Sequence, residues 1–177
     1  MDNDILKVSI SKEELDNMVK NIGNQINNDY KGKNPLIIGI LKGAVPFMND
    51  LLKVITLKVT IDYLRVSSYQ GTKSTGTITI KGDIPDVKDK DVIIVEDIID
   101  TGRTLKELKK LFEENGAKSI KIATLLDKPE GRKVEIEADY VGGIVPNEFV
   151  VGYGLDYNEY YRNLPYIGVL KEEVYKK

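Results

Sequence analysis

Three carboxylates and a polar loop lie together in the stretch VIIVEDIIDTGRTL, which covers residues 92–105. Residues 100–104 within it are expected to open a helix. Unpaired backbone N–H groups and the positive end of the helix dipole suit an anion such as a phosphate monoester. Glu96 and Asp97 would repel a phosphate, but they accept hydrogen bonds from vicinal hydroxyls and bind hydrated Mg²⁺. The spacing therefore predicts a sugar phosphate bound end to end, with its phosphate on the loop and its hydroxyls on the two acids.

The loop alone has a simpler explanation, because D-T-G-x-T is also an ordinary capped helix start. It is not a Walker P-loop, since the pattern GxxxxGK[ST] is absent from the sequence. An apolar strand that ends in two acids, followed by two apolar residues and this loop, is much more specific. The longer pattern therefore favours the sugar-phosphate interpretation.

The composition excludes several kinds of site. The 177 residues include no cysteine and no histidine, so thiol and imidazole groups are excluded as nucleophiles, bases and metal ligands. Any general acid or base must be Asp, Glu, Lys or Tyr, and a metal site must be built from oxygen, which suits Mg²⁺. The scarce arginines suit bidentate phosphate binding. They are Arg65, Arg103, Arg132 and Arg162.

Charge and hydropathy also limit the partners. The net charge of −2, from 26 basic and 28 acidic residues, leaves no overall basic footprint, so we expect no nucleic-acid partner. The sequence contains no signal-like start and no apolar run of membrane-spanning length. We therefore expect a cytoplasmic protein without a membrane partner.

Apolar runs alternate with amphipathic segments along the first 130 residues. A capping box from Ser11 to Glu14 starts the first predicted helix, which runs to about Tyr30. Uninterrupted apolar runs indicate strands that are buried on both faces. The predicted strands are 36–41, 59–66, 77–81, 91–95 and 119–126, and the other predicted helices are 44–54 and 104–115. This alternation predicts an α/β fold with a mostly parallel central sheet flanked by helices, and with a binding crevice at the carboxyl ends of the strands.

The pattern changes after about residue 130, where short strand-like segments and turns rich in Tyr, Gly and Pro continue to residue 170. We expect a single domain over residues 1–177, with a core at about 35–130. A small hood, formed by the N-terminal segment and about residues 131–177, is expected to pack over the crevice.

The central stretch resembles the phosphoribosyltransferases, whose signature for the diphosphate sugar PRPP is an apolar strand, two acids and a D-[TS]-G-x-T loop. Further stretches look like successive motifs of the hypoxanthine (6-oxopurine) branch, in family order and over almost the whole chain. They are LKGA at 41–44, SSY at 67–69, LDKP at 126–129 and FVVGYGLDYNEYYRNLP at 149–165. The resemblance implies the type I phosphoribosyltransferase fold and Mg²⁺-dependent transfer of the phosphoribosyl group from PRPP to hypoxanthine, and also to guanine.

The resemblance assigns roles to the central motif. Glu96 and Asp97 match the residues that hold the ribose hydroxyls and the associated Mg²⁺. Asp100 matches the proposed proton acceptor, since the purine must shed a proton as its nitrogen joins the ribose. The residues that match the 5′-phosphate loop are Ile99, Asp100, Thr101, Gly102, Arg103 and Thr104.

Four basic or glycine positions match the binding sites of diphosphate and base. Lys42 and Gly43 match the family's diphosphate loop, which contains a non-proline cis peptide, and Arg162 matches an arginine that reaches the diphosphate. Lys128 matches the lysine that donates to O6 of the purine, because an ammonium group has donors and no acceptor and so favours a 6-oxo group. Without the resemblance, a solvated side chain in a turn is the better explanation of Lys42 and Lys128, and Arg162 is explained as surface charge.

The remaining matches lie in the hood and in one loop. Phe149 and Val150 match positions that stack on the purine and bind its Watson–Crick edge, although Phe149 is also explained as a core aromatic residue. Asp156 matches a carboxylate near the purine that assists a second Mg²⁺, and its simpler explanation is surface charge. Ser68 and Tyr69 match the Ser-Tyr pair of the family's mobile loop, whose closure excludes water from the reacting sugar.

Two other functions stay open at this point. Some regulators reuse this fold and PRPP loop to sense nucleotides and bind RNA, and a PRPP synthase relative would explain the central loop but not the 149–165 motif. Residue identity leaves the preference among hypoxanthine, guanine and xanthine open, because main-chain groups near Val150 and Asp156 would meet the 2-position. Relatives are commonly dimers or tetramers, so we expect a homo-oligomer.

Overall fold

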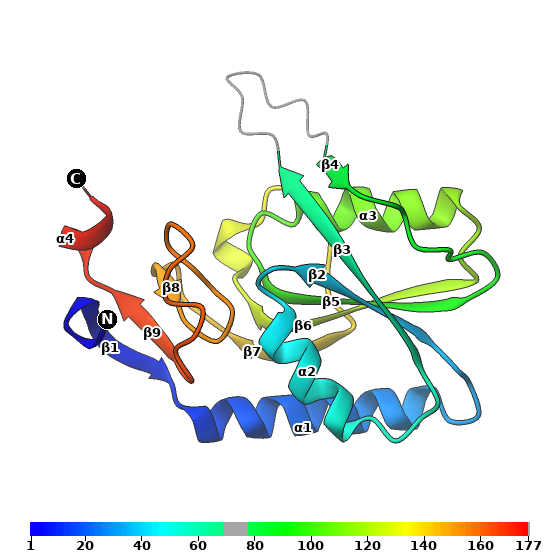
Figure 1. Cartoon of the computed structure of the whole chain (residues 1–177), viewed down its shortest axis with the longest axis horizontal. Coiled ribbons are helices and arrows are strands. Elements are labelled where there is room, and N and C mark those ends of the chain that lie inside the picture. The colour runs from blue at the N-terminus through cyan, green and yellow to red at the C-terminus, as the bar shows by residue number, and fades with distance from the viewer. Residues whose placement is uncertain (69–77, 177) are drawn as a thin grey trace.

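A six-stranded sheet forms the centre of the molecule (Figure 1). The computed structural model describes residues 1–68 and 78–176. The strand order is β4-β3-β2-β5-β6-β7, and every neighbouring pair is parallel except β3 and β4. The predicted α/β fold with a mostly parallel sheet is confirmed. The strands are β2 (Leu36–Leu41), β3 (Thr60–Ser68), β4 (Ile78–Lys81), β5 (Asp91–Ile99), β6 (Ser119–Asp127) and β7 (Tyr140–Ile144).

Helices cover both faces of this sheet, as Figure 1 shows. On one face, α1 (Lys12–Asp29) and α2 (Val45–Val54) pack together over a cluster of buried apolar side chains that includes Phe47. On the other face, α3 (Arg103–Glu114) buries Phe112 and its apolar neighbours against β2, β5 and β6. This two-sided burial explains why the central strands are apolar without alternation.

The capping box predicted for the first helix is present. The Glu14 N–H donates to the Ser11 hydroxyl at 3.2 Å, and the Ser11 N–H donates to the Glu14 carboxylate at 2.7 Å. Two of the backbone donors at this helix start are thereby satisfied. The box fixes the point where the chain leaves its first strand and enters α1.

Strand β5 is longer than the predicted 91–95. Its pairing with β6 continues through Glu96, Ile98 and Ile99. Backbone hydrogen bonding does not depend on the charge of the side chain, so the carboxylates at 96 and 97 did not end the strand. The acids therefore lie within β5 and are held by the sheet itself. Strand β3 likewise runs to Ser68, beyond the predicted end at residue 66.

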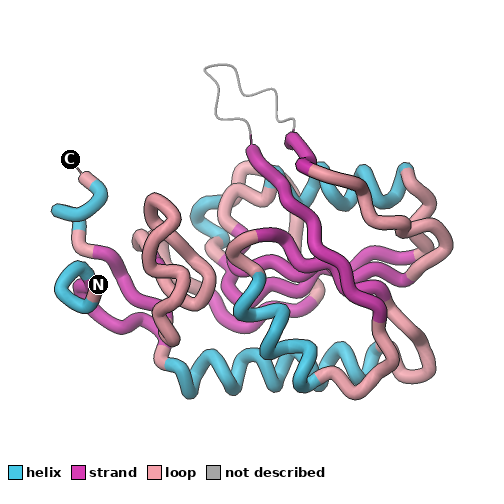
Figure 2. The backbone as a smooth tube through the Cα atoms, viewed as in Figure 1, coloured by secondary structure: helices cyan, strands magenta, loops and turns pink. Residues whose placement is uncertain are grey.

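The two ends of the chain form a second sheet beside the first. Strands β1 (Ile5–Ile10), β9 (Ile167–Leu170) and β8 (Val150–Val151) pair antiparallel in that order. Both termini lie at this end of the molecule (Figure 2), next to the short segments η1 (Asp2–Asp4) and α4 (Glu172–Tyr175). We call this three-stranded sheet with its loops the hood.

The central sheet continues past residue 130, the expected limit of the core, because β7 pairs with β6. Helix α1 also packs on α2 and β7 and so belongs to the central layers. Two glycines in β7 permit this packing: a Cβ at Gly142 would lie 2.4 Å from the Leu125 carbonyl oxygen, and one at Gly143 would lie 2.8 Å from the methyl group of Met18. The glycines that resembled a turn in the sequence thus serve close packing in a strand.

Within the described residues, no helix combines the length and apolarity needed to cross a bilayer. A short 3₁₀ turn, η2 (Pro129–Gly131), follows β6 and completes the regular elements.

Candidate active site

The predicted phosphate loop joins β5 to α3. Gly102 is the N-cap of α3 with a φ of 77°, a left-handed conformation that favours glycine. A Cβ at this position would lie 2.3 Å from Ile136 Cγ2, so a side chain has no room. The loop borders a hollow of about 130 Å³. Since one water occupies roughly 30 Å³ of the liquid, this hollow suits a phosphate group. Its lining residues are Glu96, Ile98, Ile99, Asp100, Thr101, Gly102, Thr104 and Leu105.

Glu96 and Asp97 form a half-buried acid pair inside β5. Burial raises the pKa of Glu96 well above its usual value, and the negative charge of Asp97 raises it further. Burial also raises the pKa of Asp97, although hydrogen bonds from Glu96 and from the Ile98 N–H and the positive charge of Arg162 act in the opposite direction. Two adjacent carboxylates that are costly to ionise together form a site that favours a cation.

The raised pKa of Glu96 gives a prediction for stability. In the folded state the ionised form of Glu96 is disfavoured, which costs folding stability. This loss of stability is absent below the pKa of Glu96 in the unfolded chain and grows as the pH rises toward its pKa in the folded state. Glu96→Gln removes that charge and is expected to raise the melting temperature at pH 8 by more than at pH 5. Calorimetric scans with a chelator at both pH values measure the difference.

Glu137→Gln is the matched control, because Glu137 is an exposed acid on the loop before β7. This variant is expected to change the melting temperature by the same small amount at both pH values. If Glu96→Gln gained no more stability at pH 8 than at pH 5, the pKa of Glu96 would not be raised in the folded state.

The predicted diphosphate loop packs directly on the acid pair. The Leu41–Lys42 peptide is cis, as the resemblance implies. A Cβ at Gly43 would lie 1.7 Å from an oxygen of Asp97, and a Cβ at Gly154 would lie 1.9 Å from the Gly43 carbonyl oxygen. Only glycine therefore allows this loop to lie between β5 and the hood.

Lys42 and Arg162 meet on a shared acid. Lys42 Nζ pairs with one oxygen of Glu159, and Arg162 Nη2 lies 3.1 Å from the other. Arg162 Nη2 also lies 3.0 Å from Asp156, and Nη1 donates to the Gly154 carbonyl at 2.7 Å. Hydrogen bonds from Lys42 and then from Arg162 lower the pKa of Glu159. The two cations matched to the diphosphate are thus brought together, and Glu159 pairs with both.

Lys128 lies beside the phosphate loop. It follows β6 directly and is half-buried, and its N–H donates to the Ile99 carbonyl at 2.9 Å. Within residues 1–68 and 78–176 its ammonium group has no ion-pair partner. The Asp100 carboxylate lies next to the turn that follows, because a Cβ at Gly131 would be 1.8 Å from Asp100 Oδ1. The predicted proton acceptor and the predicted O6 donor therefore come from adjoining segments.

Phe149 lies at the edge of the hood, directly before β8. Its side chain is 38% exposed, which excludes the core-aromatic explanation. The ring stacks on Tyr175 with a centroid distance of 4.7 Å and meets Tyr157 edge to face at 5.7 Å. Val150 is half-buried against the apolar cluster under α1 and α2. In the described part of the chain, no hydrogen bond links either residue to Lys128.

Sequence reasoning assigned no role to several residues that contact the predicted site. Glu159 lies within the quoted 149–165 motif, and Asp127 lies within LDKP, but neither was singled out. Arg132 was noted only as one of four arginines. The positions of Asp127 and Glu159 inside motifs were the available signal. Tyr69 lies outside the described residues, and Ser68 is the last residue of β3.

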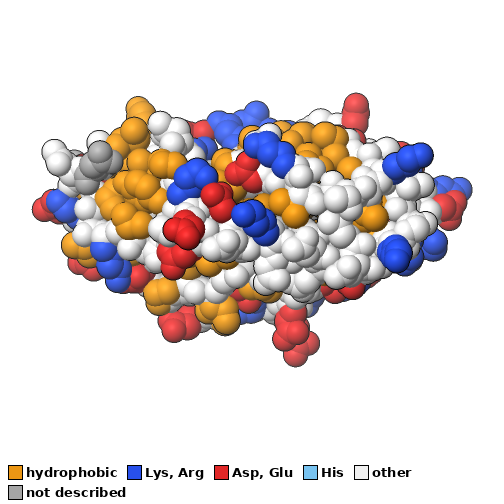
Figure 3. Space-filling model, turned by 90° about the horizontal axis from the view of Figure 1, so that it is seen from below, with side chains coloured by type: hydrophobic (Ala, Val, Ile, Leu, Met, Phe, Trp, Pro, Cys, Tyr) orange, Lys and Arg blue, Asp and Glu red, His pale blue; other side chains and the backbone are white. Residues whose placement is uncertain are grey.

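The surface carries no single-sign stripe on the face seen in Figure 3, where Lys and Arg side chains are interspersed with Asp and Glu. A nucleic-acid footprint would require a basic patch. Among the described residues, no group of three or more Asp or Glu side chains forms a ready-made metal cage. Glu96 and Asp97 thus remain an acid pair without a third carboxylate.

Several known proteins are similar to this chain over most of its length. Residues 11–158 match the phosphoribosyl transferase domain family. Hypoxanthine-guanine phosphoribosyltransferase from Streptococcus pneumoniae is 60% identical over 177 residues, which cover 99% of this chain and 98% of the relative. A crystal structure of hypoxanthine phosphoribosyltransferase from Staphylococcus aureus has a TM-score of 0.96 at 51% identity and covers 100% of this chain and 97% of its own. The Trypanosoma cruzi enzyme has a TM-score of 0.92 at 38% identity, with 97% and 94% covered.

Proposed function

The chain belongs to the phosphoribosyltransferase family, and from this premise we infer that it is a purine salvage enzyme. It transfers the 5-phosphoribosyl group of PRPP to N9 of hypoxanthine, and of guanine, giving IMP or GMP and diphosphate. The observation that carries this inference is the contact between the backbone at Lys128 and the phosphate loop. The backbone N–H of Lys128 donates to the Ile99 carbonyl at 2.9 Å. A 6-oxopurine on Lys128 then lies next to a ribose whose phosphate is on that loop. The RNA-binding regulator has no support among the matched relatives.

Each group of the reaction has a proposed partner in the site. We propose that the first turn of α3 holds the 5′-phosphate, and that Lys42 and Arg162 hold the diphosphate as it leaves. Lys128 donates to O6 and keeps the base in place, while Asp100 accepts the proton that the purine loses. The developing positive charge on the sugar is stabilised by nearby carboxylates. Phe149 and Val150 bind the base from the hood.

We propose that the acid pair binds Mg²⁺, because of the kind of ligand atoms that it offers. Glu96 and Asp97 offer hard oxygen ligands, and because burial raises the pKa of both carboxyl groups, a bound cation would stabilise their ionised forms. Mg²⁺ commonly binds one or two carboxylates together with substrate oxygens and waters, so a third acid is not required. Asp156 would assist a second ion. Bound Mg²⁺ supplies positive charge beside the ribose hydroxyls and the diphosphate.

The Glu159 contacts predict a change in diphosphate affinity. A bound diphosphate must replace Glu159 as the partner of Lys42 and Arg162. Glu159→Gln removes that competition and is expected to tighten diphosphate binding by about two- to fivefold, the scale of an exposed ion pair. The KM for PRPP should fall in parallel, while kcat changes little. Calorimetric titration with Mg-diphosphate measures the first effect.

Glu114→Gln serves as the control, because Glu114 is an exposed acid paired with Lys110 at 3.9 Å on α3. It should leave diphosphate affinity unchanged. Weaker binding in Glu159→Gln would mean that Glu159 assists the ligand instead of competing with it.

We further propose that residues 1–177 act as one domain, with the hood closing over the site. A homo-oligomer is proposed because α2 and β3 carry large exposed apolar side chains, namely Val45, Ile61 and Tyr63, with exposed fractions of 40%, 50% and 37%. PRPP carries several negative charges and does not cross a bilayer unaided, which supports a cytoplasmic location.

Turnover tests the proposed function directly. The protein is incubated with PRPP and Mg²⁺ and with hypoxanthine, guanine, xanthine or adenine in turn. Nucleoside monophosphate should form from hypoxanthine and guanine and not from adenine. The absence of product from every 6-oxopurine would contradict the proposal, and tight, salt-dependent RNA binding in the same preparation would favour the regulator.

A further inference from the structure

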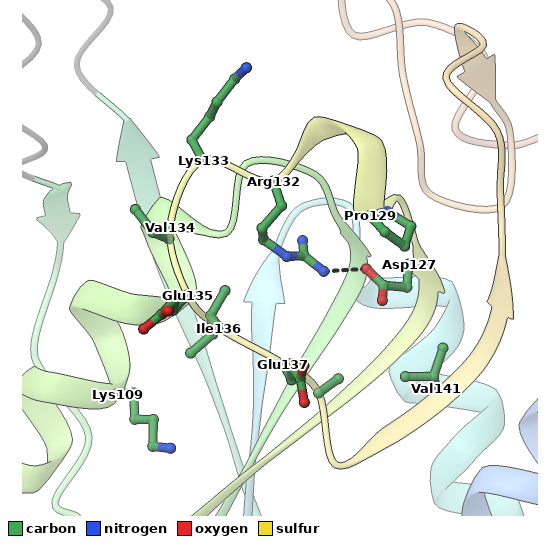
Figure 4. A pocket seen from close by; sticks show the side chains of 11 residues that line it. Lys109, Asp127, Pro129, Arg132, Lys133, Val134, Glu135, Ile136, Glu137 and Val141 are labelled. Atoms are coloured by element: carbon green, nitrogen blue, oxygen red, sulfur yellow. Dashed lines mark hydrogen bonds and ion pairs between the residues drawn. The ribbon is translucent and has the colours of Figure 1, made fainter.

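One guanidinium group joins the phosphate loop to the end of β6, the strand that Lys128 follows. Arg132 Nη1 donates to the main-chain carbonyl of Asp100 at 2.8 Å, and Nη2 forms an ion pair with Asp127 at the end of β6. In Figure 4 the guanidinium points to Asp127, while the neighbouring Lys133 points away. The Arg132 and Asp127 side chains are each only 17% exposed. The contact is therefore largely shielded from water.

The backbone on either side of Arg132 follows the phosphate loop. The Lys128 N–H donates to the Ile99 carbonyl at 2.9 Å, and the Lys133 N–H donates to the Thr101 carbonyl at 3.0 Å. The stem of Arg132 also lies against the loop, since a Cβ at Gly102 would be 3.0 Å from Arg132 Cδ. These contacts align residues 128–133 with the phosphate loop, and the guanidinium adds a side-chain link to β6.

We propose that Arg132 is a positioning residue that fixes the 5′-phosphate loop relative to Lys128, with Asp127 as its counter-ion. This inference rests on the proposed function, in which the loop holds the sugar and Lys128 holds the base. The two reacting atoms must approach to roughly 3–3.5 Å, and a displacement of about 1 Å is enough to slow a reaction on the order of 10²-fold. A link between the two binding segments therefore acts on the reaction without touching either substrate.

The arginine fork suits this task better than a lysine would. Its two terminal nitrogens donate in fixed directions and so reach a carboxylate and a carbonyl at once, whereas an ammonium group is a flexible point charge. Asp127 in turn needs a partner, because a shielded carboxylate without one is strongly destabilising. The pair is expected to act as a unit.

The test compares Arg132→Gln, Asp127→Asn, the double variant and Arg132→Lys with the wild type, at a temperature well below every melting transition. Arg132→Gln should lower kcat about tenfold or more and raise KM for PRPP and for hypoxanthine together. The double variant should lose no more kcat than Arg132→Gln alone, since both changes break the same ion pair.

Arg132→Lys keeps the charge without the fork and should still lower kcat. This variant covers the case in which Arg132→Gln does not fold. Lys133→Gln is the control and should leave all three constants unchanged.

A purely structural role would lower the melting temperature while kcat and both KM values stayed within about twofold of the wild type, and that result would overturn the proposal. Amide hydrogen exchange provides a readout without turnover. Arg132→Lys should speed exchange in residues 99–104 and 128–133 together, and unchanged protection of both segments would also overturn the proposal. If the wild type turned over no 6-oxopurine, the proposed function would fail, and amide exchange alone would decide the role of Arg132.

Discussion

Asp100→Asn is expected to lower kcat on the order of 10²-fold or more, the scale of lost general base catalysis. The amide has the same size as the carboxylate and should keep its place beside Gly131. The hydrogen bond from Arg132 is also kept, because it goes to the main-chain carbonyl of residue 100. The substitution therefore removes the proposed proton acceptor and little else. Steady-state kinetics with hypoxanthine and PRPP measure the loss, and KM for PRPP should change little.

The control for this substitution is Asp89→Asn in the turn before β5. Asp89 is exposed and has a φ of 59°, a conformation that asparagine also adopts readily. Its kcat should equal that of the wild type. An unchanged kcat in Asp100→Asn would remove Asp100 from the role of proton acceptor and leave the base to a different residue.

Lys128→Met should lower kcat/KM for hypoxanthine by about 10- to 150-fold. A hydrogen bond from a charged donor is worth roughly 1.5–3 kcal/mol, and each 1.4 kcal/mol corresponds to about a factor of ten. Methionine keeps most of the side-chain volume, and the Lys128 N–H can still donate to the Ile99 carbonyl. The change thus removes the proposed O6 donor while the adjoining phosphate loop stays in place. KM for PRPP is expected to stay within about twofold.

Lys133→Met provides the matched control. Lys133 is exposed, and its contact with the phosphate loop is made by its backbone N–H, which the substitution keeps. A loss of equal size in Lys133→Met, or no loss in Lys128→Met, would contradict the assignment of O6 to Lys128.

The sheet was predictable where burial is visible in the sequence. Leu36–Leu41 forms a buried strand because its apolar run fits a layer covered on both faces, and the Ser11 capping box marks the start of α1. The end of β5 was misplaced because the acids at 96 and 97 resemble a strand end, whereas the backbone ladder continues to Ile99. Strand β7 was missed because Gly142 and Gly143 pack against other segments, which is a tertiary contact.

The site was predictable as a set of motifs but not as a set of contacts. The stretch 92–105 indicates a sugar phosphate from charge and helix-end chemistry alone. The partner of Lys42 is Glu159, which is 117 positions away in the sequence. Such a pairing depends on how the hood meets the loop after β2, and residue types at short spacing do not encode it. The Arg132–Asp127 pair depends likewise on the path of η2.

A crystal structure with IMP bound would test the central claim, which is that one ligand is divided between the phosphate loop and Lys128. The claim predicts the 5′-phosphate within hydrogen-bond distance of the backbone N–H groups of residues 101–104. It also predicts the ribose hydroxyls at Glu96 and Asp97 and the purine O6 at Lys128 Nζ. A phosphate bound elsewhere, or a base whose O6 faces away from Lys128, would contradict the account.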